Sequence, residues 1–266
     1  RHPNYVGDVG IGINPKLAQR VRDADYIFSF GARLGEITTS GYTLIQSPVP
    51  SQKLVHVHSD ANELGRVFRP TSAVAADAGQ LVQQIAKRLS KTIEPARRTW
   101  TDQARKDYET WQQPVETPGA LKMENVVSHL NEVLPADAIL TNGAGNYSAW
   151  LHRYYRYRSF RTQLAPTSGS MGYGLPAAVA AKIERPAQEV ICLAGDGCFQ
   201  MTMQEFGVAC EHNANLIVLI SNNGMYGTIR LHQQKKFPKR PSGTKIFNPN
   251  FAELAKSYGA FGAVAA

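Results

Sequence analysis

The architecture of this chain follows from two stretches of sequence, VICLAGDG at residues 190–197 and LIVLISNN at residues 216–223. Each opens with a short, partly β-branched apolar run, which is typical of a buried parallel strand. The residues between them predict a helix over about Met201 to Glu211, so the whole indicates a βαβ unit with a right-handed crossover. Because both strands then end at the same edge of the sheet, we expect Asp196 and Asn223 to lie side by side, where open α/β sheets bind ligands.

The side chains expected at this edge are hard oxygen donors. The Asp196 carboxylate and the Asn223 amide oxygen suit magnesium or calcium and would be poor ligands for a soft metal. Gly197 and Cys198 begin the next helix, so their amide groups can face an anion at the helix N-terminus. The two motifs together predict a diphosphate held through a divalent cation. Taken alone, the Gly-Asp-Gly motif would more often be a simple turn.

Three ordered blocks resemble the thiamine diphosphate-dependent enzymes of the pyruvate decarboxylase and acetohydroxyacid synthase superfamily. The first is Gly195-Asp196-Gly197 followed by Asn222-Asn223, which is similar to the cofactor signature of that family. The second is GSMGYGLPAA at residues 169–178, similar to the segment that supports the bent cofactor, and the third is NPNFA at residues 248–252. The resemblance covers residues 120–266 as the diphosphate-binding domain and, more weakly, residues 1–92 as the central domain.

The resemblance implies a role for each matching residue. Asp196, Asn223 and the backbone carbonyl of Met225 are implied as magnesium ligands. The Gly169 carbonyl is implied to accept a hydrogen bond from the exocyclic amine of the cofactor. Met171 is implied to hold the cofactor rings in a V shape, a wedge that suits a flexible thioether, with ordinary core packing as the alternative. The other expected cofactor-binding residues are Asn142, Gly143, Gly145, Asn146, Ser170, Gly195, Gly197, Cys198, Tyr226 and Gly227.

The chain is predicted to be α/β, with two Rossmann-like domains whose parallel sheets are flanked by helices. We expect a central domain over residues 1–92, truncated at its start, and a thiamine diphosphate- and magnesium-binding domain over residues 121–266, truncated at its end. Residues 93–120 are expected to form a linker that can be helical from Thr99 to Gln112. Further elements are predicted as a helix starting at Asn14-Pro15, strands at residues 26–30, 54–58 and 138–141, and a helix at residues 77–89.

The first domain raises other cofactor alternatives. A nicotinamide dinucleotide is disfavoured, because no GxGxxG pattern follows a strand. FAD is left open: acetohydroxyacid synthases bind it in the equivalent domain through a Gly-x-Arg-Phe-Asp loop, and the loop here is GARLGE at residues 31–36, without the Phe-Asp. His56 and His58 alternate onto one strand face as possible metal ligands, but packing is favoured because no third ligand is evident.

Composition narrows the class of protein. The chain has 266 residues, 43% of them hydrophobic, a net charge of +8 and three cysteines. No apolar run approaches the ~18 residues of a membrane span, and the cysteines fit no zinc spacing. We therefore expect a cytoplasmic protein with reduced thiols. The basic stretches at residues 153–161 and 235–240 would suit nucleic acid, but solvated surface helices are the favoured explanation.

The resemblance implies a 2-oxo acid substrate such as pyruvate, which is decarboxylated and joined to a second carbonyl compound. Acetolactate synthase is the nearest type, and a homodimer or homotetramer is implied for the full-length protein. A simple decarboxylase of the benzoylformate type and a non-catalytic cofactor-binding fragment stay open. His232 stands where biosynthetic acetohydroxyacid synthases have Trp, which leaves the acceptor substrate open.

The catalytic residue itself is not assigned. Family members take an activating Glu from a pyrimidine-binding domain, and nothing in residues 1–120 resembles that domain. We therefore expect this chain alone to be inactive.

Overall fold

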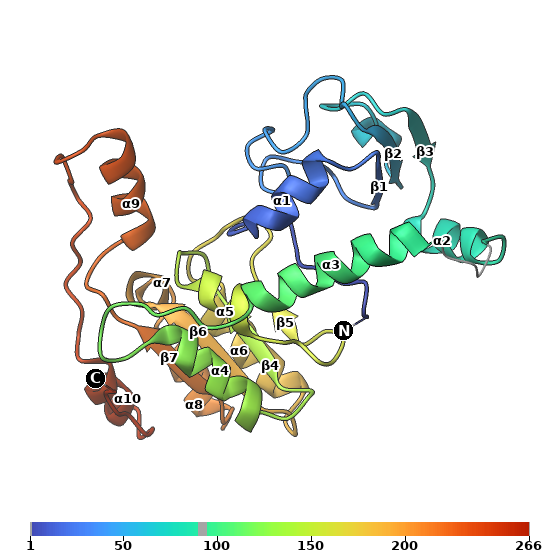
Figure 1. Ribbon diagram of the computed structural model, residues 1–266. Helices are drawn as coiled ribbons and strands as arrows, with labels where there is room; N and C mark the ends of the chain where they lie inside the picture. Colours follow the sequence, from blue (N-terminus) through green and yellow to red (C-terminus); the bar gives the residue numbers. More distant parts are fainter. Residues whose placement is uncertain (1, 90–94, 266) are drawn as a thin grey trace. The chain divides into compact units, whose positions relative to one another are not determined.

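The computed structural model describes residues 2–89 and 95–265. The chain forms two compact units, Arg1–Gln113 (unit 1) and Pro114–Ala266 (unit 2), which are coloured from blue to green and from green to red in Figure 1. Residues 93 and 94 of the predicted linker lie outside the described residues, as do residues 1, 90–92 and 266 of the predicted domains.

Unit 1 is built on a three-stranded parallel sheet in the order β1-β2-β3. Its strands are β1 (Tyr26–Phe30), β2 (Lys53–His58) and β3 (Ser72–Ala75). Its helices are α1 (Pro15–Arg22), the 3₁₀ turn η1 (Ala61–Glu63), α2 (Ala78–Ala86) and α3 (Pro95–Trp111). The sequence pattern did not predict β3, because this strand is only four residues long, largely exposed and rich in alanine, which favours strands weakly. Its place is fixed by pairing with β2, where Val57 lies opposite Val74.

Helix α1 begins as the sequence predicts. The Asn14 side chain caps it by accepting the Lys16 N–H at 3.0 Å, and Pro15 stands in the first turn, where its missing N–H costs nothing.

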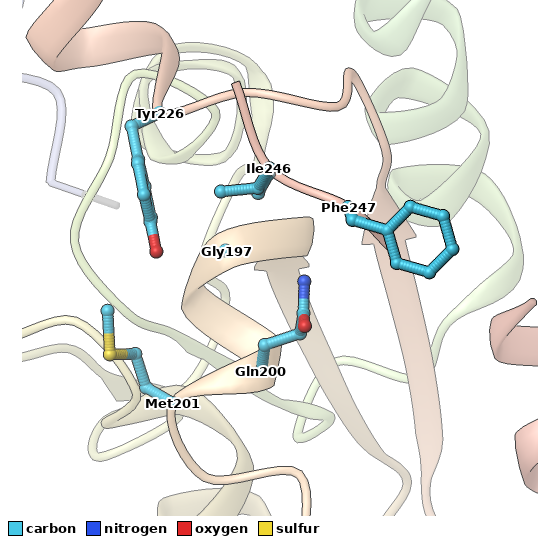
Figure 2. A pocket seen from close by; sticks show the side chains of 6 residues that line it. All are labelled: Gly197, Gln200, Met201, Tyr226, Ile246 and Phe247. Carbon is cyan, nitrogen blue, oxygen red and sulfur yellow. The ribbon is translucent and has the colours of Figure 1, made fainter. Parts of the chain in front are cut away.

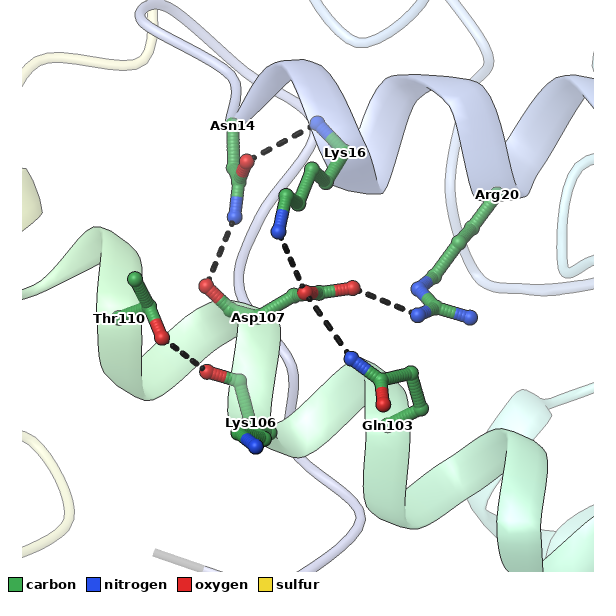
Figure 3. A network of polar contacts seen from close by, with 7 residues as sticks. All are labelled: Asn14, Lys16, Arg20, Gln103, Lys106, Asp107 and Thr110. Atoms are coloured by element: carbon green, nitrogen blue, oxygen red, sulfur yellow. Dashed lines mark hydrogen bonds and ion pairs between the residues drawn. The ribbon is translucent and has the colours of Figure 1, made fainter.

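The carboxylate of Asp107 in helix α3 makes several polar contacts, two of them ion pairs with α1. Asp107 forms ion pairs with Lys16 Nζ at 2.9 Å and Arg20 Nη2 at 2.6 Å, and it also accepts a hydrogen bond from Gln103 (Figure 3). The hydrogen bonds from Arg20 and then Lys16 lower the pKa of Asp107 from 3.8 to about 2. The sequence predicted a helix from Thr99 to Gln112, and the observed helix starts earlier, at Pro95. Its ion pairs with α1 place it within unit 1.

Unit 2 contains a four-stranded parallel sheet in the order β5-β4-β6-β7. Its strands are β4 (Ile139–Asn142), β5 (Gln163–Leu164), β6 (Val190–Gly195) and β7 (Ile217–Ser221). Its helices are α4 (Met123–Val133), α5 (Ser148–Tyr154), α6 (Gly174–Glu184), α7 (Asp196–Gln200), α8 (Glu205–Glu211), α9 (Gly227–Lys236) and α10 (Phe251–Ser257).

Helices cover both faces of this sheet. Successive residues of β6 alternate between two core clusters: Ile191 packs in one cluster with Leu151 of α5, whereas Cys192 packs in the other with Ala178 of α6. Because side chains of a strand point alternately to opposite faces, the clusters lie on either side of the sheet. The predicted α/β class, with parallel sheets flanked by helices, is confirmed.

The predicted βαβ unit is present with one correction. Strands β6 and β7 are parallel neighbours, and Gly195 pairs with Ser221. The connection contains two helices, α7 and α8, and the predicted helix is wrong at residues 201–204, which form turns. The Thr202 hydroxyl donates a hydrogen bond to the Gly172 carbonyl at 2.8 Å. This tertiary contact, absent from the local pattern, accompanies the break.

Candidate cofactor and metal site

Two loops meet helix α7 where the strands of unit 2 end, and the Cys198 thiol of α7 contacts both of them. Its sulfur accepts hydrogen bonds from the Gly172 N–H and from the Tyr147 hydroxyl, both at 3.1 Å. The thiol also donates to the Ala144 carbonyl at 3.7 Å. The loop that follows β4 and the loop that precedes α6 are therefore tied to α7, which contains Cys198, at one sulfur atom.

Tyr147 lies in the middle of this junction, and sequence reasoning missed it. A Cβ atom at Gly145 or Gly195 would stand 2.8 Å from the Tyr147 ring, so both positions need glycine for this packing. Burial raises the pKa of Tyr147 well above its usual value, as does the bond to Cys198. The hydroxyl therefore stays protonated and acts as a donor. No local signal marks Tyr147, because its role depends on two glycines far apart in sequence, Gly145 after β4 and Gly195 at the end of β6.

Asp196 is the first residue of α7, is 3% exposed, and accepts only neutral N–H groups. Its Oδ1 atom accepts the Gly197 N–H at 2.9 Å. Its Oδ2 atom accepts the Gly224 N–H at 2.8 Å and Nδ2 of Asn248 at 2.7 Å. Among residues 2–89 and 95–265, no cationic side chain forms an ion pair with it. Because a buried charge is costly without an opposite charge, this carboxylate fits a bound cation.

Asn223 lies in the loop between β7 and α9, beside Asp196 as the βαβ unit predicts. Its Oδ1 atom accepts the Met225 N–H at 3.1 Å, and the adjoining Gly224 N–H reaches Asp196. Carboxylate, amide and carbonyl oxygens are the donors that magnesium and calcium prefer. The residues at this edge therefore match the chemistry of a hard divalent cation.

Residues 244–248 are brought to the same edge by pairing with the loop after β7. The Tyr226 N–H donates to the Thr244 carbonyl at 2.8 Å, and the Ile246 N–H donates to the Gly224 carbonyl at 3.1 Å. This antiparallel bridge pairs Met225 with Lys245 and leaves the Met225 carbonyl outside its two hydrogen bonds. The sequence block starting at Asn248 signalled the family, but nothing in it indicated contact with Asp196.

A pocket of about 190 Å³ opens beside α7 (Figure 2). The Tyr226 ring lies over Gly197, where a Cβ atom would stand only 2.7 Å from ring atom Cε1. Glycine at this position therefore permits the close approach of Tyr226. The pocket is lined by Gly197, Gln200, Met201, Tyr226, Ile246 and Phe247.

The loop after β4 is joined to the start of α9. The Asn146 N–H donates to Thr228 Oγ1 at 2.9 Å, next to Gly227. Asn142 is buried and donates to the Gly143 carbonyl at 2.7 Å, while its Oδ1 atom is without a partner in the described part of the chain.

The predicted residues before α6 are less closely joined to Asp196. The Ser170 hydroxyl bonds to Ser168 at 2.8 Å, and within the described ranges no hydrogen bond joins Gly169 or Ser170 to Asp196. Met171 packs, partly buried, against the core cluster that contains Cys198. Of the two roles considered for Met171, the contacts in the structure are those of core packing.

The structure gives ordinary local contacts to the residues of unit 1 that were considered as metal ligands or as a flavin loop. His56 Nε2 lies 2.8 Å from the Ala32 carbonyl, and His58 Nδ1 accepts the Asp60 N–H at 3.0 Å. Over the described ranges, no three His, Cys, Asp or Glu side chains are grouped as a metal site. Arg33, in the loop that resembles a flavin loop, pairs with Glu63 at 3.4 Å. None of the helices in residues 2–89 and 95–265 has the length and apolar character needed to span a membrane.

Comparison with curated proteins finds relatives named as acetolactate synthases. The large subunit from Parasynechococcus marenigrum is 29% identical over 250 residues, which are 91% of this chain and 39% of that protein. Acetolactate synthase of Mycobacterium leprae is 28% identical, over 98% of this chain and 43% of its own length. The isozyme 2 large subunit of Escherichia coli is 26% identical, over 98% and 46%. The chain therefore spans less than half the length of these relatives.

Two family models match the chain in the order expected from its motifs. The central domain of thiamine pyrophosphate enzymes matches residues 1–85, and their C-terminal TPP binding domain matches residues 143–266. Neither description, and none of the relatives' names above, supports FAD. The chain belongs to the thiamine pyrophosphate (thiamine diphosphate) enzyme family, of which it carries the central and the C-terminal cofactor-binding domains.

Proposed function

We propose that unit 2 binds thiamine diphosphate through a magnesium ion, and that the chain serves acetolactate synthase-like chemistry on a 2-oxo acid. The observation that carries this proposal is the charge of Asp196, which is buried among neutral N–H donors beside the Asn223 loop. A divalent cation would supply the missing positive charge and would bridge to the diphosphate, as magnesium commonly does.

Different residues at the edge of the sheet would contact the cation, the diphosphate and the rest of the cofactor. Asp196, Asn223 and the Met225 carbonyl would hold the cation through oxygen. Because the Gly197 N–H already donates to Asp196, the Cys198 N–H is the better candidate for the diphosphate. Asn142, Gly143, Gly145 and the Tyr226 ring would border the cofactor.

When bound, thiamine diphosphate supplies the electron sink that decarboxylation of a 2-oxo acid needs. The residues of this chain would bind and orient the cofactor. Tyr147 keeps its proton because its pKa is raised, and Asp196 is occupied by N–H donors. Neither is thus placed to transfer a proton, and the activating Glu of the family is assigned to no residue here.

The finer assignments are carried over from the resemblance. They are pyruvate or a similar 2-oxo acid as donor, a homodimer or homotetramer as the assembled protein, and domain limits at residues 1–92, 93–120 and 121–266. Product analysis separates the coupling reaction from simple decarboxylation, since the first gives a hydroxyketone and the second a free aldehyde.

Calorimetric titration of thiamine diphosphate with and without MgCl₂ tests the proposal directly. We expect saturable binding that requires magnesium and disappears in Asp196→Ala. Asp107→Ala is the matched control, because it removes a carboxylate of unit 1 that touches none of the site residues. Undiminished magnesium-dependent binding by Asp196→Ala would refute the metal assignment.

A further inference from the structure

The amide of Asn248 lies between two other polar side chains of the site. Its Nδ2 atom donates one hydrogen bond to Asp196 Oδ2 at 2.7 Å and a second to Asn222 Oδ1 at 2.8 Å. Its Oδ1 atom accepts a hydrogen bond from Gln200 Nε2 at 2.6 Å. Both N–H groups of this amide and one lone pair of its oxygen are thus in use.

The orientation of this amide is therefore set. If it turned over, its oxygen would face the Asp196 carboxylate and the Asn222 oxygen, and its NH₂ group would face the NH₂ group of Gln200. All three contacts would become repulsive. The contacts with Asp196, Asn222 and Gln200 thus together select the orientation in which Asn248 donates to Asp196.

The two oxygens of Asp196 are consequently unequal. Each carboxylate oxygen has two lone-pair directions. Oδ2 accepts two hydrogen bonds, from Gly224 and Asn248, whereas Oδ1 accepts one, from Gly197. Oδ1 is therefore the oxygen with capacity for a further ligand. Oδ1 of Asn223, which accepts one N–H from Met225, has the same spare capacity.

We infer that Asn248 is a positioning residue for the cation: it occupies Asp196 Oδ2 and so presents Oδ1 to the metal. This inference rests on the proposed function, because it needs a cation at Asp196. It adds a residue 52 positions away in sequence, which reaches the site because residues 244–246 pair with residues 224–226.

Removal of this amide should weaken cation binding without removing a ligand. With Asn248 gone, Oδ2 regains a free lone pair and the carboxylate loses a restraint on its rotation. Loss of an outer partner of a metal ligand typically costs about 10–100-fold in metal affinity. We expect a loss in that range for Asn248→Leu, which keeps the size of the side chain and removes its hydrogen bonds.

The experiment titrates MgCl₂ into the full chain at a fixed excess of thiamine diphosphate, by calorimetry, and records the thermal midpoint of each variant. Asn250→Leu is the matched control. Asn250 lies two positions further on and caps α10 by accepting the N–H groups of Ala252 and Glu253. A merely structural loss near α10 would lower the thermal midpoint in both variants and leave magnesium affinity unchanged.

The outcomes separate the inference from the proposal beneath it. Weaker magnesium binding by Asn248→Leu, with wild-type affinity in Asn250→Leu, supports the inference. Wild-type affinity in Asn248→Leu overturns the inference and leaves the proposed function standing. Absence of magnesium-dependent binding in the unmodified chain overturns the proposed function and the inference with it. If Asn248→Leu does not fold, Asn248→Ala, which adds no bulk, is judged by the same criteria.

Discussion

Asp107 in unit 1 and Asp196 in unit 2 are both buried carboxylates, at 8% and 3% exposure, yet they are held in opposite ways. Asp107 is paired with two cations, Lys16 and Arg20, which neutralise its charge. Asp196 receives three neutral N–H groups and no cation from the described part of the chain. The charge of the partners, and not the extent of burial, thus distinguishes a carboxylate that joins two helices from one suited to a metal ion.

The two carboxylates also differ in what surrounds them. Asp107 lies between two helices, and the side chain of Lys16 on one side is 65% exposed. Asp196 lies at the end of a buried strand, where glycine backbone and the Tyr226 ring approach closely. Lysine and arginine side chains can adapt to Asp107, whereas we expect the close-packed backbone and ring around Asp196 to form a rigid frame.

The largest expected effect comes from neutralising each carboxylate in turn. Asp196→Asn should weaken magnesium-dependent binding of thiamine diphosphate by more than about 100-fold, because a neutral amide replaces the only charged ligand of the proposed site. Asp107→Asn should leave that binding unchanged. Parallel calorimetric titrations of the two variants measure this difference. Equal losses of cofactor affinity in both would contradict the distinction between Asp107 and Asp196.

Gly197→Ala tests the rigid frame around Asp196. The added methyl group would stand 2.7 Å from Tyr226 Cε1, so we expect cofactor affinity to fall by about tenfold and stability by about 1–3 kcal/mol, as for an overpacked core. Gly35→Ala in unit 1 is the control, since a Cβ atom there meets nothing within 4 Å. If the two variants behave alike in thermal unfolding and cofactor titration, the frame is not rigid.

Acid should weaken unit 1 through Asp107. Because its folded-state pKa is lowered from 3.8 to about 2, Asp107 contributes stability that is present above pH 3.8 and is lost as the pH falls towards 2. A shift of this size corresponds to at most about 2.5 kcal/mol, and screening at the exposed Lys16 reduces the expected contribution to on the order of 1 kcal/mol.

Urea unfolding followed through Trp100 and Trp111, in a Trp150→Phe background, would measure this contribution. The stability difference between the background protein and its Asp107→Asn variant should be largest near neutral pH and should shrink below pH 3.8. A difference that stays constant with pH would show that the ion pairs with Lys16 and Arg20 do not stabilise α3.

The smallest expected effect on magnesium affinity comes from Gln200, which donates a hydrogen bond to Asn248. Gln200→Leu removes one of the three contacts that set the orientation of the Asn248 amide and leaves the bond to Asp196 possible. We expect magnesium affinity to fall by about threefold, less than for loss of a group that contacts the ligand itself. A loss as large as that of Asn248→Leu would mean that Gln200 controls the carboxylate more directly than its contacts indicate.

Regular elements with strong local signals were predictable from sequence. The Asn14 cap, β1, β2, β4, β6 and β7 follow from capping chemistry and apolar runs, and the edge shared by Asp196 and Asn223 follows from βαβ topology. Strands β3 and β5 were not predicted, because four and two residues carry too little pattern and depend on a neighbouring strand. The predicted helix from Met201 gives way to turns at residues 201–204, where Thr202 makes a contact to Gly172 that no local pattern encodes.

The sequence by itself determined the α/β class, the order of the motifs and the family, because strand periodicity, glycines and oxygen ligands are local chemical facts. Only the tertiary structure decided that Tyr147 fills the junction of the loops and that Asn248 reaches Asp196. Those contacts join residues 51 and 52 positions apart. Their geometry is set by the packing of whole loops, so the residue types alone do not specify it.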